Sequence, residues 1–177
     1  MKRLLLIRHA QPLVAEGTPA DDWPLTDKGR FDAGALVGRL ADRSMTTIVY
    51  TSPERKARET AALAFPSVAA QVREQLREVK RPWYAKPKEF THAVAEYLKG
   101  EVVEGWESRE DIAVRLASLT ADSAPWERTV VVTHGVLLTT WLHQVVGLED
   151  PFGFWSNLRM PDAWELDREE SSLERVV

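Results

Sequence analysis

The chain alternates short apolar runs with longer segments in which apolar residues recur every three or four positions. The short runs are rich in Leu, Val, Ile and Thr, which is typical of buried strands, and they cover residues 2–8, 46–51 and 128–134. The helical spacing of apolar residues predicts five helices, over 27–42, 53–64, 88–99, 108–121 and 136–146. Weaker patterns predict strands over 68–79 and 163–166, loops over 9–24 and 80–88, and a frayed polar tail after residue 166.

Strands and helices alternate from one end of the chain to the other. This order favours a mainly parallel sheet with helices on both faces, because consecutive parallel strands need a crossover connection. A length of 177 residues, with no internal repeat and no linker, predicts one domain over residues 1–177. Thr26 is the expected N-cap of the first helix, and Pro53 is expected in the first turn of the second.

Composition excludes several classes of function. The absence of cysteine excludes disulfides, thiolate metal ligands and a cysteine nucleophile. The net charge of −4 argues against a nucleic-acid surface, and no apolar run approaches the roughly 20 residues that span a membrane. Because the first apolar run is too short for a signal peptide, we expect a cytoplasmic protein.

Candidate chemistry lies where the predicted strands end. The first strand leads to Arg8 and His9, a permanent cation beside a group that titrates near neutrality. The strand over 128–134 leads to His134, which is followed by Gly135 and by a helix whose first N–H groups are available to an anion. Because the carboxyl ends of parallel strands meet at one crevice, we expect both histidines there, at a phosphate site.

The helix that begins near Pro53 opens with three cations. The simplest interpretation of Arg55, Lys56 and Arg58 is a solvated helix face, with an i,i+4 pair between Arg55 and Glu59. The position of this helix at the same edge of the sheet makes one of the cations a candidate anion ligand. A metal site on the two histidines is not expected, because no third ligand has suitable spacing.

Six motifs together resemble the histidine phosphatase superfamily, the phosphoglycerate-mutase-like proteins. They are Arg8-His9-Ala10, Leu25-Thr26-Asp27-Lys28-Gly29, the block from Ser52 to Ala61, Leu76-Arg77-Glu78, Glu107-Ser108 and Thr133-His134-Gly135. Each motif alone is weak, but six in the family's order over nearly the whole chain are specific. The resemblance implies a phosphoglycerate-mutase-like α/β/α sandwich that works without a metal or a cofactor.

The resemblance also implies a role for each matching side chain. His9 is the nucleophile that forms a phosphohistidine, while Arg8 and His134 bind phosphoryl oxygens. Glu78 is the general acid for the leaving alcohol and then the base that activates water, although Glu74 lies nearby in the same charge-rich segment. Phosphoryl transfer depends mainly on positioning and charge stabilisation, which fixed cations and donors supply.

Three positions depart from the family's pattern. Ala10 replaces a glycine, and a backbone outside the left-handed region tolerates this change. Lys56 replaces the second phosphate-binding arginine, so the charge stays but the bidentate fork is lost, and we expect weaker phosphate binding. The family's asparagine in the loop after the first motif has no recognisable counterpart, and Gln11 is the expected polar substitute.

The resemblance implies a small phosphatase that hydrolyses phosphate monoesters of small molecules. Three alternatives stay open: a protein phosphohistidine phosphatase, a mutase-type phosphotransferase, and a non-catalytic domain that binds a phosphorylated ligand. A protein phosphohistidine phosphatase would usually lack the acid glutamate. The non-catalytic alternative is motivated by Lys56, which replaces the second phosphate-binding arginine. Neither the natural substrate nor the oligomeric state follows from the sequence.

Overall fold

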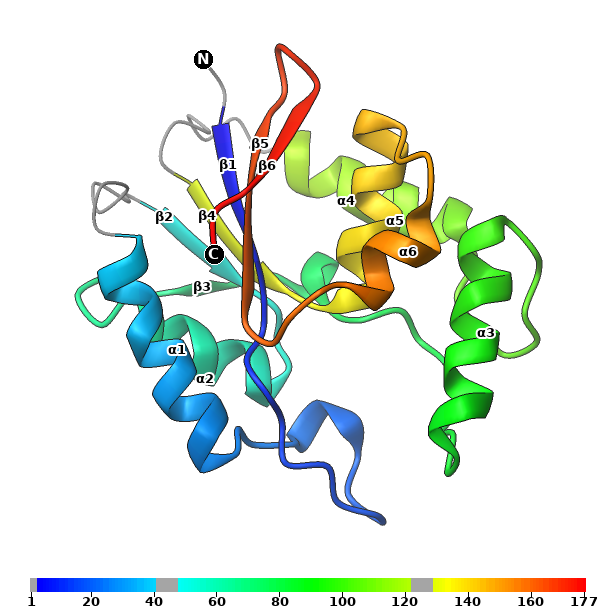
Figure 1. Ribbon diagram of the computed structural model, residues 1–177, viewed down its shortest axis with the longest axis horizontal. Helices are drawn as coiled ribbons and strands as arrows, with labels where there is room; N and C mark the ends of the chain where they lie inside the picture. The colour runs from blue at the N-terminus through cyan, green and yellow to red at the C-terminus, as the bar shows by residue number, and fades with distance from the viewer. Residues whose placement is uncertain (1–2, 41–47, 122–128) are drawn as a thin grey trace.

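A computed structural model describes residues 3–40, 48–121 and 129–177 of the chain. A six-stranded sheet in the order β3-β2-β4-β1-β5-β6 forms its centre (Figure 1). The strands are β1 (Arg3–Arg8), β2 (Ile48–Thr51), β3 (Gln71–Val72), β4 (Thr129–Thr133), β5 (Asp162–Asp167) and β6 (Ser172–Arg175). The first four strands are parallel to one another, whereas β5 and β6 extend the β1 edge in antiparallel pairing.

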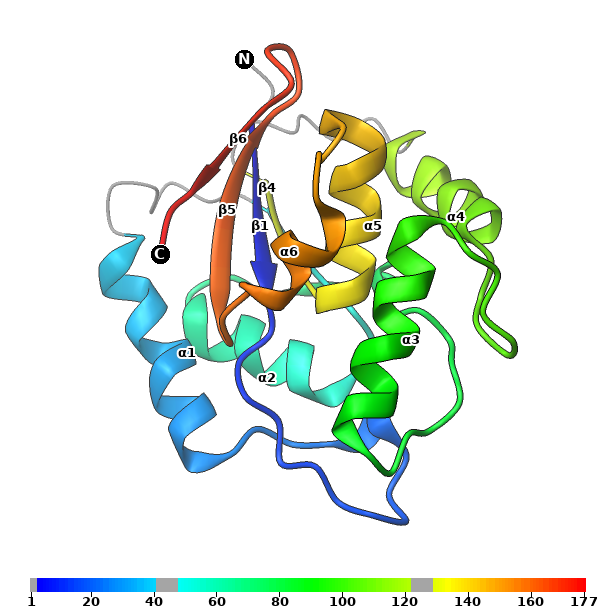
Figure 2. The same ribbon diagram turned by 45° about the vertical axis from the view of Figure 1, so that its right-hand side comes forward.

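Helices cover both faces of the sheet (Figures 1 and 2). They are α1 (Asp27–Arg39), α2 (Arg55–Ala64), α3 (Pro87–Lys99), α4 (Arg109–Ala121), α5 (Gly135–Val146) and α6 (Pro151–Ser156). Alternate residues of β1 point to opposite faces, so Leu5 and Ile7 pack with α1 and α2 while Leu4 and Leu6 pack with the other helices. The predicted three-layer α/β/α sandwich with a mainly parallel sheet is confirmed.

The entry into α1 explains one of the sequence motifs. The Thr26 side chain accepts the Gly29 N–H at 2.9 Å, which is the predicted N-cap. A Cβ atom on Gly29 would lie 2.3 Å from the Gln11 carbonyl oxygen, so only glycine fits at this position. The motif therefore fixes the loop after β1 against the first turn of α1.

The predicted strand over 68–79 is mostly wrong. Only Gln71 and Val72 pair with β2, and a 3₁₀ turn over Glu74–Leu76 follows them. Both strand residues are exposed, and β3 lies at the edge of the sheet, so little buried apolar surface stabilises a longer strand. Glu78 therefore lies in a loop beyond this turn and not at a strand end. Residues 2, 41, 42, 46, 47 and 128 of the predicted elements lie outside the described residues.

The predicted frayed tail is also wrong, because β6 pairs with β5. The Arg175 guanidinium binds the carboxylate of Asp162, at 3.0 Å through Nε and 2.6 Å through Nη2. Asp162 is fully buried, so this ion pair ties the end of the chain to the sheet. The short helix α6 was not predicted, and it begins at the N-cap Asp150 and places Trp155 near the carboxyl ends of the strands.

Candidate active site

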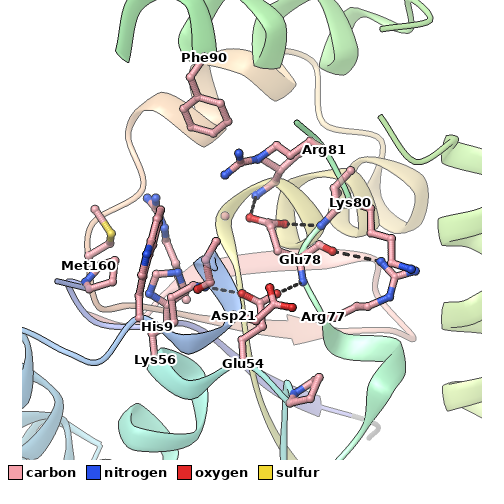
Figure 3. A pocket seen from close by; sticks show the side chains of 18 of the residues that line it. His9, Asp21, Glu54, Lys56, Arg77, Glu78, Lys80, Arg81, Phe90 and Met160 are labelled. Atoms are coloured by element: carbon pink, nitrogen blue, oxygen red, sulfur yellow. Dashed lines mark hydrogen bonds and ion pairs between the residues drawn. The ribbon is translucent and has the colours of Figure 1, made fainter. Parts of the chain in front are cut away.

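A cleft of about 860 Å³ lies at the carboxyl ends of the parallel strands. Its walls come from the end of β1, the starts of α2 and α5, the loop after Leu76, and parts of α3 and α6. Figure 3 shows His9 and Lys56 on one side of the cleft and Glu78 and Arg81 on the other. Arg8 also lines it, so the structure brings together the predicted residues of three different motifs.

His9 follows β1 and has one ring nitrogen free. Its backbone N–H donates to the Thr133 carbonyl at 2.9 Å, which extends the β1–β4 pairing by one step. Its Nδ1 lies 2.7 Å from the Ala10 carbonyl oxygen, so Nδ1 carries the proton and Nε2 keeps its lone pair. Burial, followed by the nearby His134, Arg8 and Lys56, holds the pKa of His9 well below 6.5, so the ring is neutral at pH 7.

His134 lies beneath His9 as the N-cap residue of α5. It is fully buried, and the two ring centres are 5.1 Å apart. Its Nε2 is 2.7 Å from Ser52 Oγ and 3.4 Å from Glu54 Oε1, and because a carboxylate only accepts, we assign the ring proton to Nε2. Burial, then Lys56 and Arg8, holds the pKa of His134 well below 6.5.

Arg8 extends from the last position of β1 toward the start of α5. Its Nη1 donates to the Leu158 carbonyl at 2.9 Å, while its buried Nε has no hydrogen-bond partner among the described residues. A Cβ atom on Gly135 would lie 3.1 Å from the guanidinium carbon, so the glycine of the Thr-His-Gly motif lets Arg8 approach the helix. Because Arg8 lines the cleft, its guanidinium, with an unpaired Nε–H, is a candidate donor to a phosphoryl oxygen.

Glu78 occupies the start of α5, where an external anion was expected to bind. Its Oε1 accepts the N–H groups of Leu137 at 2.8 Å and Val79 at 3.0 Å, and its Oε2 accepts that of Val136 at 3.2 Å. The free N–H groups at the start of α5 are therefore bound by a carboxylate of the protein itself. These bonds hold Glu78 in the cleft, opposite His9 (Figure 3).

Glu54 is the site residue that sequence reasoning missed. It is only 4% exposed, and its carboxylate forms an ion pair with Lys56, whose Nζ also donates to the Ala20 carbonyl at 2.8 Å. Its Oε1 accepts the backbone N–H of Glu78 at 2.7 Å. Glu54 thus links the start of α2 to the loop that carries Glu78, and it neutralises Lys56 in the resting site. Its position two residues before Lys56, in the motif block, was the available signal.

Three further expectations concern Gln11, Ala10 and Arg55. Gln11 is exposed and does not line the cleft with the other expected phosphate ligands, and its role in phosphate binding stays a prediction. Its carbonyl accepts the Thr26 N–H at 3.0 Å. Ala10 has no left-handed backbone, and its N–H donates to Thr60 Oγ1 at 3.0 Å, so the change from glycine is tolerated as expected. Arg55 pairs with Glu59 at 2.8 Å, as predicted for a solvated helix face.

The motifs and the fold agree with a comparison of the sequence with protein families. The model of the histidine phosphatase superfamily (branch 1) matches residues 4–166. The chain belongs to this superfamily. A comparison with curated proteins finds no significant match.

Solved structures share the fold of this histidine phosphatase. Mycobacterial glucosyl-3-phosphoglycerate phosphatase in complex with VO3 is 22% identical, with a TM-score of 0.75, and the match covers 100% of this chain and 98% of that one. Phosphoserine phosphatase from Entamoeba histolytica in complex with 3-phosphoglyceric acid is 19% identical, with a TM-score of 0.72 and coverage of 100% and 96%. At these identities the likeness shows the fold.

Two features are absent from residues 3–40, 48–121 and 129–177. No group of three or more His, Cys, Asp or Glu side chains there is arranged to hold a metal ion. No helix there is long and apolar enough to cross a membrane.

The two buried histidines predict that acid destabilises the fold. Below pH 6.5 the unfolded chain binds protons on both rings, while the folded state does not, because both pKa values are held well below 6.5. Between pH 6.5 and 5.5 the free energy of unfolding should therefore fall by about 1 kcal/mol for each histidine, with a slope that approaches about 1.4 kcal/mol per pH unit at lower pH. Urea unfolding at pH 6.5, 6.0 and 5.5 measures this slope, and His9→Gln should reduce it by about half. A stability that stays constant over this interval would show that the folded rings accept protons.

The Glu54–Lys56 pair predicts that a carboxylate opposes phosphate binding. Glu54→Gln should lower the inhibition constant of inorganic phosphate about 10-fold, because a negative charge near the anion is removed. The same variant should lose about 3 kcal/mol of folding free energy without phosphate, since Lys56 is left buried and unpaired. Glu89→Gln removes an exposed carboxylate of α3 that pairs with Lys86, and it should change neither quantity. Weaker phosphate inhibition in Glu54→Gln would contradict this account.

Proposed function

We propose that this histidine phosphatase hydrolyses small phosphate monoesters in the cytoplasm, without a metal, through a phosphohistidine on His9. The observation that carries the proposal is the hydrogen-bond distance of 2.7 Å between His9 Nδ1 and the Ala10 carbonyl oxygen. That bond fixes the tautomer in which Nε2 is an unprotonated nucleophile, and the low pKa of His9 keeps the ring neutral. The cleft beside it holds the cations that a phosphoryl group needs.

In the first half-reaction, His9 Nε2 attacks phosphorus while the bond to the leaving oxygen breaks. Glu78, in its protonated form, gives its proton to that oxygen, so the product leaves as a neutral alcohol. Oε2 is the oxygen suited to carry this proton, because its one backbone hydrogen bond, at 3.2 Å, is longer than the two that Oε1 accepts. In the second half-reaction, the Glu78 carboxylate takes a proton from water. The resulting hydroxide displaces His9 from phosphorus and releases inorganic phosphate.

Charge stabilisation in this proposal comes from Arg8, Lys56 and His134. Arg8 offers its unpaired Nε–H, and Lys56 offers its ammonium group from the start of α2. His134 donates through Nε2–H, which a phosphoryl oxygen would receive in place of Ser52 and Glu54. Binding of the phosphoryl group thus exchanges partners at His134 and Lys56, whereas the Arg8 Nε–H gives up no partner among the described residues.

One observation favours a second candidate, a domain that binds a phosphorylated ligand without turnover. Glu54 cancels the charge of Lys56 inside the cleft, and this weakens the second phosphate contact. The intact set of His9, Arg8, His134 and Glu78 favours catalysis over this alternative.

The proposal predicts activity that depends on His9 and not on a metal. Turnover of an aryl phosphate should continue in EDTA, and His9→Ala should lower kcat at least about 10³-fold, because the covalent route is lost. The matched control is His143→Ala on the exposed side of α5, which should keep its activity. Wild-type protein that binds phosphate without releasing it from any ester would favour the binding domain. Full activity in His9→Ala would refute the mechanism.

Glu78 distinguishes an ester phosphatase from a protein phosphohistidine phosphatase. Glu78→Gln should lower kcat for an alkyl phosphate about 100-fold, because a poor leaving alcohol needs the proton. The loss for an aryl phosphate should be much smaller, since its leaving group needs less protonation. Unchanged turnover of alkyl phosphates in Glu78→Gln would favour the phosphohistidine substrate.

A further inference from the structure

The cleft extends beyond the groups that the proposed reaction uses. Its far wall is formed by the loop after Glu78, with Lys80 and Arg81, and by Phe90 of α3. Figure 3 shows Arg81 between Phe90 and Glu78, on the side of the cleft opposite His9. A leaving group protonated by Glu78 would extend toward this wall, so Lys80 and Arg81 are candidates for contacting it.

Arg81 packs against an aromatic ring, and its guanidinium makes few hydrogen bonds with the described residues. Its guanidinium carbon lies 4.3 Å from the centre of the Phe90 ring, which is a close cation–π contact. Its Nη1 reaches only the Pro82 carbonyl, at 3.4 Å, and its buried Nε has no hydrogen-bond partner in the described part of the chain. Because Nε is buried, an acceptor in the cleft would reach the guanidinium through its Nη atoms, of which Nη1 makes only this long contact.

Two other cations of the cleft, Lys56 and Arg77, are already paired with carboxylates. Lys56 is paired with Glu54, and Arg77 makes two bonds of 2.8 Å to the Glu107 carboxylate. Within the described ranges, no carboxylate forms an ion pair with Lys80 or Arg81. Arg81 also acts on the reacting centre, because its charge contributes to lowering the pKa of His134. A positive charge without an ion-pair partner among the described residues therefore stands beside the leaving-group side of the site.

We propose that Arg81, assisted by Lys80, forms a second anion subsite that binds a carboxylate or phosphate carried by the leaving group. This inference rests on the proposed function, because it assigns the far wall to the alcohol part of a phosphate monoester. A guanidinium held against an aromatic ring loses little freedom on binding, and its fork suits a carboxylate or phosphate with two parallel bonds. The preferred substrate class is thus a phosphate monoester that bears a second anionic group.

Matched substrates test the subsite. O-phosphoserine and O-phosphoethanolamine differ by one carboxylate, and the bisphosphate and monophosphate of propane-1,3-diol differ by one phosphate. In one of these pairs, wild-type kcat/KM should be at least about 10-fold higher for the member with the second anionic group, since a bidentate charged contact contributes more than one neutral hydrogen bond. The pair that shows this preference identifies the anion as a carboxylate or a phosphate. Arg81→Gln should abolish this preference mainly through KM, and Arg81→Lys should restore part of it.

Controls separate the subsite from the catalytic proposal. Lys86→Gln removes an exposed lysine at the start of α3 and should leave the preference unchanged. The subsite would be overturned if Arg81→Gln lowered kcat/KM equally for both members of each pair, or if the wild type showed no preference for the doubly anionic members. Either result would leave the phosphatase proposal intact. If no ester is hydrolysed, the proposed function fails. Calorimetric binding of O-phosphoserine and of the bisphosphate to wild type and Arg81→Gln would then decide the subsite independently.

Discussion

The parallel pairing of β1 with β4 is the constraint on which the site depends. Its register places Arg8 opposite Thr133, so the residues that follow, His9 and His134, leave the sheet side by side with ring centres 5.1 Å apart. Both strands are buried on both faces, and a shift by one residue would move each apolar side chain to the wrong layer. The packing of the core thus sets the geometry of the two histidines.

Charge balance is the second organising feature. Near the reacting centre, Arg8 and Lys56 face two carboxylates, Glu54 and Glu78, while both histidines are neutral. Glu54 holds Lys56, and the start of α5 holds Glu78, so both carboxylates have partners within the protein. An incoming phosphate dianion must compete with Glu54 for Lys56. Arg81, on the far wall of the cleft, adds a positive charge that attracts an anionic substrate.

Sequence patterns predicted the elements whose residues are buried, and missed those that depend on distant partners. The strands β1 and β4 have continuous apolar runs, so Arg8, His9 and His134 could be placed at their ends. The strand β6 is held by the ion pair between Arg175 and Asp162, which are 13 residues apart. The role of Glu54 depends on the backbone N–H of Glu78, which lies 24 residues away in the sequence and is brought near only by the tertiary structure. The short edge strand β3 and the six-residue helix α6 offered too little periodicity to be recognised.

The central claim is that the phosphoryl group passes through His9, and trapping the intermediate tests it most directly. Wild-type protein and His9→Ala would be mixed with a phosphate monoester, quenched in base during turnover, and digested for mass spectrometry. The account predicts an acid-labile, base-stable phosphoryl group on the wild-type peptide that contains His9, and none in the variant. A phosphoryl group on another residue, or steady turnover without any phosphorylated protein in rapid-quench experiments, would contradict it.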